Sequence, residues 1–312
     1  MITTLTLNVA IDQVYELDSL MIGQTNRVLQ KSQQGGGKGV NVARVIASLG
    51  GEVNIGGFVG GLNGSKIVEL LQEENLQTEF IQIEEENRIC LTIINQQTKE
   101  MSELLEVGPT IHDQEWINML KWIESKAEYA TYFVLSGSLP QGIQKTAYAT
   151  IIHLLKEKGI RVALDTSGDA LKKGITAIPF IIKPNEDEIT QLIGRPALTH
   201  EDLVQAGIKF QKLGIEHVCL SLGEQGALFV HPSGVYKVNA PRINVVNTVG
   251  SGDAFLGGLI YKLSQGADPT EAYKWAVACG SANAAHKGIA KVQRDTVEKL
   301  LEEIQITKIK EK

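Results

Sequence analysis

The chain has 312 residues, of which 43% are hydrophobic and 21% are charged, enough to bury a large core in one domain or in one domain with an insertion. The formal net charge of −6 argues against a surface that binds nucleic acid. No apolar run approaches the roughly 18 to 20 residues that span a bilayer, and the N-terminus lacks the pattern of a signal peptide, so we expect a cytoplasmic protein with no membrane partner.

Strand-like apolar runs alternate with helical patterns along most of the chain, beginning with a strand near the N-terminus. Further strands are predicted at 53–59, 131–136, 161–165, 179–183 and 217–221. Helices are predicted at 38–49, 64–75, 112–127, 145–158, 199–213, 251–264 and 268–286. Continuous apolar runs suit strands that are buried on both faces. The alternation therefore predicts an α/β fold, with a mostly parallel sheet covered by helices on both faces.

Two regions break this alternation: residues 11–34 contain no clear helix, and 79–106 hold two or three strand-like runs in succession. Strands without helices between them pair antiparallel and can expose one face. We therefore expect a small sheet, a lid that covers a site, pairs with another subunit, or does both. The expected boundaries are 11–34 and 88–106 for the lid, and 1–10, 35–87 and 107–312 for the main domain.

The remaining segments carry weaker signals. Residues 226–239 predict a hairpin at the far edge of the main sheet, and the charged tail after Ile306 is expected to fray. We interpret the three widely spaced cysteines as buried thiols, and the six scattered histidines as structural or surface residues rather than metal ligands. The acidic residues at 84–86 and 103–106 are interpreted as solvated faces.

The most informative segment is Thr248–Phe255, which opens an apolar helix with two glycines and places Asp253 in its first turn. Glycines let a phosphate approach the backbone, and the free N–H groups of a helix start favour negative charge. A carboxylate beside an anion site would repel the anion, but it could serve as the base that deprotonates an attacking hydroxyl. The alternative is that Asp253 only caps its helix.

A second glycine cluster, Gly35–Asn41, leads directly into the predicted helix at 38–49 and carries Lys38. It lacks the spacing of a Walker A loop, and the alternative interpretation is a flexible turn with a solvated lysine. Other polar groups follow predicted strands, at the sheet edge where ligands bind in open α/β folds. These groups are Asn8 and Asp12, Ser136–Ser138, Lys183–Glu188 and Ser221–Gly223. Arg88 begins a predicted lid strand, where it is either a surface residue or a clamp for a substrate phosphate.

Taken together, these residues resemble those of the PfkB (ribokinase-like) carbohydrate kinases, in the branch with tagatose-6-phosphate kinase and 1-phosphofructokinase. The resemblance runs from Thr4 to about Leu300. It rests on Gly-Gly-Lys-Gly-Val-Asn at 36–41, Ser-Gly-Ser-Leu-Pro at 136–140, Lys-Pro-Asn-Glu-Asp-Glu at 183–188, Ser-Leu-Gly at 221–223 and Thr-Val-Gly-Ser-Gly-Asp at 248–253. It implies a three-layer α/β/α sandwich with a small β-sheet lid, ATP and Mg²⁺ as cofactors, and a lid that often also forms a homodimer.

The resemblance also implies roles for individual residues. Asp253 would be the catalytic base, and Gly250, Ser251 and Gly252 would lie at the transferring phosphoryl group. The implied sugar-phosphate ligands are Asp12, Gly36, Gly37, Lys38, Asn41, Arg88, Ser138 and Arg27. The implied nucleotide ligands are Lys183, Asn185, Ser221, Gly223, Gly226, Gly250 and Gly252. Asn185 and Glu188 match a family pattern that helps to hold magnesium, which we expect to be indirect.

Three functional hypotheses follow, of which an ATP-dependent ketohexose-phosphate kinase is preferred. The segments 87–90, 104–109 and 241–247 look closer to tagatose-6-phosphate kinases, which favours tagatose 6-phosphate over fructose 1-phosphate as the substrate. An NAD-dependent oxidoreductase is disfavoured, because no G-x-G-x-x-G follows the first strand. A catalytically silent sugar-phosphate sensor is disfavoured by the intact Asp253.

Overall fold

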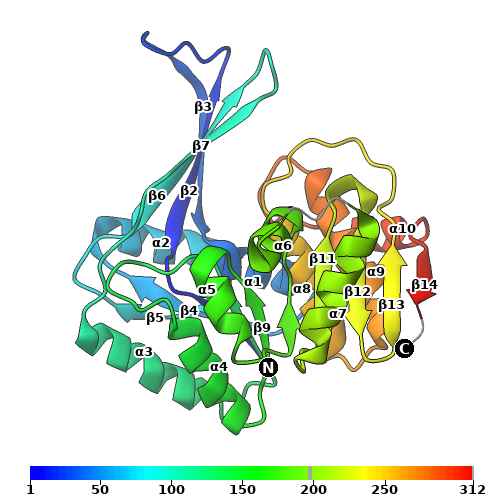
Figure 1. Ribbon diagram of the computed structural model, residues 1–312. Helices are drawn as coiled ribbons and strands as arrows, with labels where there is room; N and C mark the ends of the chain where they lie inside the picture. Colours follow the sequence, from blue (N-terminus) through cyan, green and yellow to red (C-terminus); the bar gives the residue numbers. More distant parts are fainter. Residues whose placement is uncertain (196–198, 311–312) are drawn as a thin grey trace.

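The computed structural model describes residues 1–195 and 199–310 of the chain. A ten-stranded sheet lies between two layers of helices, and a separate four-stranded sheet projects from one end of this body (Figure 1). The predicted α/β fold, with a mostly parallel main sheet and a small additional sheet, is confirmed.

The main sheet has seven parallel strands followed by three antiparallel ones. In spatial order the parallel strands are β5 (Gln77–Gln82), β4 (Val53–Val59), β1 (Ile2–Thr6), β8 (Tyr132–Ser136), β9 (Arg161–Asp165), β10 (Ile181–Ile182) and β11 (His217–Ser221). The antiparallel strands are β12 (Ala227–His231), β13 (Gly234–Val238) and β14 (Ile306–Lys310). Every residue of β1, β4 and β8 is buried, as expected for central strands covered on both faces.

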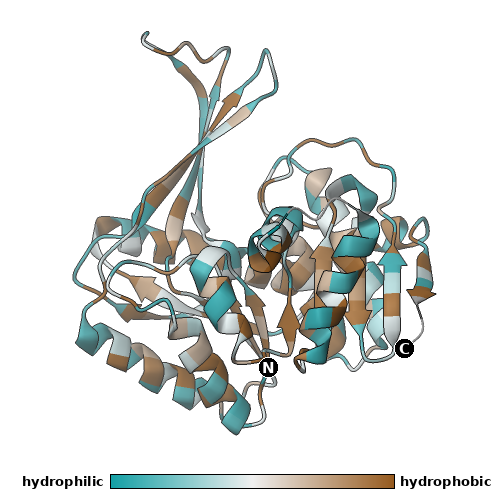
Figure 2. Cartoon of the chain, in the orientation of Figure 1, coloured by the Kyte–Doolittle hydropathy of each residue, from teal (hydrophilic) through white to brown (hydrophobic). Residues whose placement is uncertain are grey.

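Helices on the two faces of the main sheet form two separate hydrophobic cores. One core receives side chains from α1 (Lys38–Ser48), α2 (Gly61–Glu73), α8 (Ser251–Ser264), α9 (Pro269–Ala284) and α10 (Arg294–Leu301). The other receives them from α3 (Asp113–Lys126), α4 (Ala147–Glu157), α5 (Gly168–Ile175), α6 (Glu186–Ile193) and α7 (His200–Lys212). The outer helices are hydrophilic toward solvent and hydrophobic toward the sheet (Figure 2). No helix among the described residues is long and apolar enough to cross a membrane.

Helix α8 is held closely between α1 and α9 by two consecutive glycines. A Cβ atom on Gly257 would lie 2.8 Å from the side chain of Val45, and one on Gly258 would lie 2.6 Å from the Cys279 sulfur. A larger side chain at either position would force the helices apart. The start of α8 is therefore fixed relative to α1.

The small sheet, here called the lid, has the strand order β3 (Val28–Gly36), β2 (Ala10–Leu17), β6 (Arg88–Asn95) and β7 (Met101–Leu105). Its outer pairs, β2–β3 and β6–β7, are antiparallel, but β2 and β6 run parallel. The expectation of purely antiparallel pairing was therefore wrong. It overlooked that a long stretch of the main domain separates β2 from β6, so the chain can return in the same direction.

Other expectations also need correction. The first part of the 79–106 region does not join the lid, because residues 77–82 form β5 beside β4 in the main sheet. The tail after Ile306 does not fray as far as the structure describes it: it forms β14, which pairs with β13 and replaces the predicted hairpin as the sheet edge. The short helices α5, α6 and α10 had not been predicted. Both strands of the 226–239 hairpin are present as predicted.

Candidate active site

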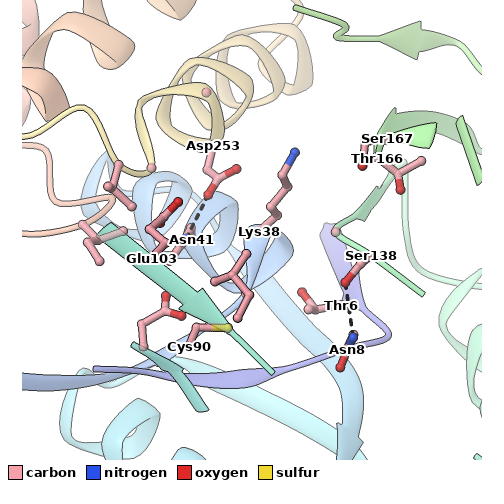
Figure 3. A pocket seen from close by; sticks show the side chains of 18 of the residues that line it. Thr6, Asn8, Lys38, Asn41, Cys90, Glu103, Ser138, Thr166, Ser167 and Asp253 are labelled. Atoms are coloured by element: carbon pink, nitrogen blue, oxygen red, sulfur yellow. Dashed lines mark hydrogen bonds between the residues drawn. The ribbon is translucent and has the colours of Figure 1, made fainter. Parts of the chain in front are cut away.

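The carboxyl ends of the parallel strands and the inner face of the lid enclose a cavity of about 530 Å³ (Figure 3). Its walls combine the ends of β1, β8 and β11, the starts of α1 and α8, and residues of β2, β6 and β7. This is the edge at which open α/β sheets bind their ligands. The cavity joins the main body and the lid in one site.

The start of α8 forms one wall. Gly250 precedes the helix in a left-handed conformation (φ 77°) and has no side chain to cap it. The N–H groups of Gly252 and Asp253 find no acceptor among the described residues, since the first helical bond runs from Ala254 to Gly250. These free donors at the positive end of the helix dipole form an anion site.

Asp253 is the third residue of α8, and its buried carboxylate points into the cavity rather than capping the helix (Figure 3). Its Oδ2 accepts a hydrogen bond of 2.8 Å from Nδ2 of Asn41 on α1. Burial raises the pKa of Asp253 to about 6, and the charge of Lys38 offsets part of this effect. A carboxylate with such a pKa is ionised at neutral pH and more basic than an exposed aspartate.

Two lysines converge on a buried aspartate at the end of β9. The Nζ atoms of Lys38 and Lys183 each lie 3.4 Å from Oδ1 of Asp165. Burial alone would raise the pKa of Asp165, but Lys183 and Lys38 outweigh it and hold that pKa below its ordinary value. The pKa of Lys38 is raised chiefly by Asp165. Lys38 is therefore held in its charged form, and both lysines line the cavity.

The lid supplies a second set of polar groups. Asp12 on β2 is paired with Cys90 on β6. Arg88 lies two residues before Cys90, so it is on the same face of that strand. Burial raises the pKa of Asp12 to about 6, and the positive charges of Arg44 and Arg88 offset part of this increase. Arg88 donates to the carbonyl oxygens of Glu106 and Asn8 at 3.0 and 3.2 Å, which fixes its guanidinium at the base of the lid.

Asn185 and Glu188 form a capping box at the start of α6. The Asn185 side chain accepts from the Glu188 N–H at 2.8 Å, and the Glu188 carboxylate accepts from the Asn185 N–H at 3.0 Å. Asn185 lines the cavity, whereas Glu188 does not. This reciprocal pair satisfies two of the free N–H groups at the start of α6.

Most of the predicted site residues meet in this one cavity. Its lining includes Asp12, Gly37, Lys38, Asn41, Arg88, Ser138, Lys183, Asn185, Ser221, Gly250, Gly252 and Asp253. Outside the lining lie Arg27, Gly36, Glu188, Gly223, Gly226 and Ser251.

The residues outside the lining have visible positions of their own. Arg27 is exposed, just before β3, and Gly36 packs against Asp12, where a Cβ would lie only 2.1 Å from the carboxylate. Ser251 Oγ accepts from Asn283 at 2.9 Å. Gly226 has φ 90° and sits against the backbone of Val238, so it shapes a turn.

Sequence reasoning missed Asp165, which is buried beside the cavity and is not part of its lining, although it pairs with two lysines that are. Asp165 ends a strand that had been predicted, and the rule applied to polar residues after other strands would have found it. Glu103 is exposed, as expected of a solvated face, whereas Cys90 is only partly buried, unlike Cys219 and Cys279; Glu103 and Cys90 also line the cavity from the lid, which had not been predicted (Figure 3). The sequence could not reveal this, because the register of β6 with β7 decides which side chains face inward.

The fold also gathers Glu216, His217 and His231 at the opposite edge of the main sheet, with ligand-type atoms within 4.8 Å of one another. His217 Nδ1 lies 2.8 Å from the Tyr273 hydroxyl. His231 Nδ1 lies 2.6 Å from the Ser233 hydroxyl, and its Nε2 lies 3.7 Å from a Glu216 carboxylate oxygen. Because Nδ1 of each histidine contacts a hydroxyl group and His231 faces Glu216, the cluster fits a structural network of hydrogen bonds.

Comparison with known proteins agrees with this geometry. Residues 5–295 match the model of the pfkB family of carbohydrate kinases. The chain is 35% identical to tagatose-6-phosphate kinase of Staphylococcus epidermidis over 312 residues, covering 99% of this chain and 100% of the relative. It is similar to the solved structure of phosphofructokinase-2 from Escherichia coli in complex with substrates and products, with a TM-score of 0.91, 28% identity and coverage of 96% and 98%.

A ribokinase from Thermotoga maritima has the same fold, with a TM-score of 0.79 at 21% identity and coverage of 97% and 99% of the two chains. The family match spans the strands, the helix starts and the lid residues that build the cavity. The chain belongs to the pfkB family and is a carbohydrate kinase.

Proposed function

We propose that the chain transfers the γ-phosphoryl group of ATP to a hydroxyl of a ketohexose phosphate, and that its substrate is tagatose 6-phosphate. The observation that carries this proposal is the position of Asp253, a buried carboxylate beside the free N–H groups of its own helix. A base and an anion site side by side suit phosphoryl transfer.

In the proposed reaction the Asp253 carboxylate takes the proton of the sugar hydroxyl. The hydroxyl oxygen forms a bond to the γ-phosphorus, the bond from that phosphorus to the bridging oxygen breaks, and ADP leaves with the electron pair. The N–H groups of Gly252 and Asp253 stabilise the charge on the transferring group, together with Lys38 and Lys183. Most of the catalysis is positioning and charge stabilisation, as phosphoryl transfer requires.

Two cations that line the cavity, Arg88 on the lid and Lys38 on α1, favour a substrate that already carries a phosphate. Arginine in particular binds phosphate through charged hydrogen bonds. The Nε atom of Arg88 is buried without a hydrogen-bond partner in the described structure. Asp12, Asn41 and Ser138 would accept or donate hydrogen bonds to the sugar hydroxyls. Arg27 lies outside the cavity, so a role in phosphate binding would need movement of the lid or a second copy of the chain.

The nucleotide would lie along Lys183, Asn185 and Ser221, with Gly223 and Gly226 shaping the adjoining turn. A magnesium ion would bind with the ATP phosphates in the same region, held through water by Asn185, which lines the cavity, and by its capping partner Glu188. The amide oxygen of Asn185 accepts one hydrogen bond, from the Glu188 N–H, and keeps a second lone pair for such a water. When bound, magnesium neutralises the charge of the ATP phosphates.

The lid also offers a surface for a second copy of the chain. It exposes the apolar side chains of Leu29 on β3, Leu104 on β7 and Val107 beyond it, whereas Leu105 lines the cavity. Exposed apolar side chains of this density are typical of interaction sites. We propose a homodimer through the lid, and light scattering of the purified protein would test it: a monomer at micromolar concentration would contradict it.

Fructose 1-phosphate is the alternative substrate, since it presents the same chemical groups with its phosphate at the other end. The similarity to a tagatose-6-phosphate kinase over the whole chain favours tagatose 6-phosphate. The test is ATP- and magnesium-dependent turnover of tagatose 6-phosphate, fructose 1-phosphate, fructose 6-phosphate and ribose, side by side. The highest kcat/KM with tagatose 6-phosphate is expected. A higher kcat/KM with fructose 1-phosphate would make that sugar phosphate the substrate instead. No turnover of any of the four sugars would favour a non-catalytic sugar-phosphate sensor.

A further inference from the structure

Behind the cavity lies a buried arginine that the proposed reaction does not use. Arg44 is on α1, one turn after Asn41, and is only 5% exposed. Its Nε and Nη2 atoms donate to the two carboxylate oxygens of Glu74, which caps the end of α2. Nη2 also donates to the carbonyl oxygen of Gly35, at 2.6 Å, in lid strand β3. The guanidinium is therefore fixed by a two-pronged ion pair and by the backbone.

The third guanidinium nitrogen of Arg44, Nη1, faces Asn41, the residue that contacts Asp253. Nη1 donates to Oδ1 of Asn41 at 2.8 Å, and Nδ2 of Asn41 donates to Oδ2 of Asp253 at 2.8 Å. An arginine can only donate hydrogen bonds, whereas an asparagine amide has one accepting and one donating end. Arg44 therefore forces the oxygen of Asn41 toward itself and the NH₂ group toward Asp253. A flipped amide would set its oxygen against the carboxylate and its NH₂ group against the guanidinium.

We propose that Arg44, held by Glu74, is a positioning residue that orients the Asn41 amide and, through it, the carboxylate of Asp253. The proposal rests on the proposed role of Asp253 as the base. It assigns Arg44 and Glu74 no contact with substrate. The chain Glu74–Arg44–Asn41–Asp253 runs from the rim of α2, where the Glu74 side chain is 25% exposed, to the reacting group.

The same guanidinium links the base to the lid. Gly35, whose carbonyl it holds, pairs with Ile11 in the lid sheet, next to Asp12. Arg44 is also the positive charge that most lowers the pKa of Asp12 against the effect of burial. Arg44 thus acts on two of the cavity carboxylates: on Asp253 of the main body through Asn41, and on Asp12 of the lid through its charge.

Two variants test the proposal without changing any residue that lines the cavity. Arg44→Lys keeps the positive charge, but a single ammonium group cannot bond to Glu74 and Asn41 at once. Glu74→Gln removes the negative charge that pairs with Arg44 and so weakens the hold on its guanidinium. We expect kcat to fall about tenfold in Arg44→Lys and less in Glu74→Gln, with the KM for ATP unchanged. The matched control is Glu298→Gln, which breaks the Arg294–Glu298 pair on α10. It should leave turnover unchanged.

The pH profile separates positioning from simple loss of stability. The Asn41 hydrogen bond favours ionised Asp253, so its loss should move the acid limb of kcat/KM to higher pH. The other charged groups that act on Asp253 are Lys38, Asp165 and Lys183, which both variants leave in place. Unchanged kcat and an unmoved acid limb in folded Glu74→Gln and Arg44→Lys would overturn the proposal.

A double-variant cycle gives the sharpest result. In an Asp253→Asn background, Arg44→Lys should cause no further loss of turnover, because the group that it positions is no longer a base. A second loss of the same factor would show that Arg44 acts elsewhere and would overturn the proposal. Failure of the proposed function looks different: the Asp253→Asn background would itself stay active. Thermal unfolding of each variant confirms that the folded protein is being compared.

Discussion

The two sheets of this molecule divide the site between them, and they differ in how firmly they hold their residues. The central strands of the main sheet are buried along their whole length; α8 and α1 carry Asp253 and Lys38, and Lys183 directly follows β10. The lid strand β7 is exposed at every residue, and β3 is exposed over its first half. In the proposed reaction, the buried sheet would carry the groups that act on the transferring phosphoryl group, and the more exposed lid would carry groups that recognise the sugar phosphate.

This comparison predicts that variants of the main body lower kcat, whereas variants of the lid raise the KM for the sugar phosphate. The largest effect is expected for Asp253→Asn, which keeps the shape and the Asn41 contact but removes the base. Its kcat should fall by roughly 10² to 10⁴, the usual contribution of a positioned general base. Steady-state assays with saturating ATP measure it. Near-normal turnover would mean that another group takes the proton.

Arg88→Ala tests the lid side. Loss of a charged hydrogen-bonding partner should raise the KM for the sugar phosphate by about 10- to 100-fold and leave the KM for ATP unchanged. Lys38→Ala should act in the same direction, with an additional fall in kcat because Lys38 also acts on Asp253. Arg195→Ala is the control, since Arg195 is an exposed arginine paired with Asp202. An unchanged sugar-phosphate KM in Arg88→Ala would remove that residue from the phosphate site.

The pH dependence of activity sharpens the assignment of the base. Because the pKa of Asp253 is raised to about 6, the carboxylate should be protonated and inactive below that pH. The titration of Asp253 alone should lower kcat/KM about tenfold for each pH unit below 6. Asp12 has a similar pKa and would contribute to the same limb, so Asp12→Asn should be profiled beside the wild type. A fall in kcat/KM that begins only near pH 4 would contradict the assignment of the buried Asp253 as the base, because its pKa is about 6.

The smallest predicted effect concerns stability. The pKa of Asp253 lies near 6 in the folded chain and near 4 when unfolded, so the folded state binds more protons between these values. Its contribution to stability is therefore present below about pH 4 and lost as the pH rises through 6. At pH 7 the neutral Asp253→Asn variant should melt a few degrees higher than the wild type. The difference should vanish near pH 4, and a lower melting temperature at pH 7 would contradict it.

The sequence allowed prediction of the two glycine-rich helix starts and most of the polar strand ends, because glycine and buried apolar runs have strong local signatures. It did not reveal the Lys38–Asp165–Lys183 group, since that contact depends on the spatial order of strands that are distant in the chain. The role of Glu103 depends on strand register in the lid. Tail residues 306–310 carry too many lysines to suggest a strand, yet an edge strand needs only one partner.

The measurement that tests the division between the two sheets most directly is calorimetric binding of tagatose 6-phosphate to Asp253→Asn and to Arg88→Ala, side by side with the wild type. The Asp253→Asn variant should bind within a few-fold of the wild type although its turnover is lost. The Arg88→Ala variant should bind about tenfold more weakly or worse, since a charged partner of the phosphate is gone. Loss of binding in Asp253→Asn together with normal binding in Arg88→Ala would contradict the account.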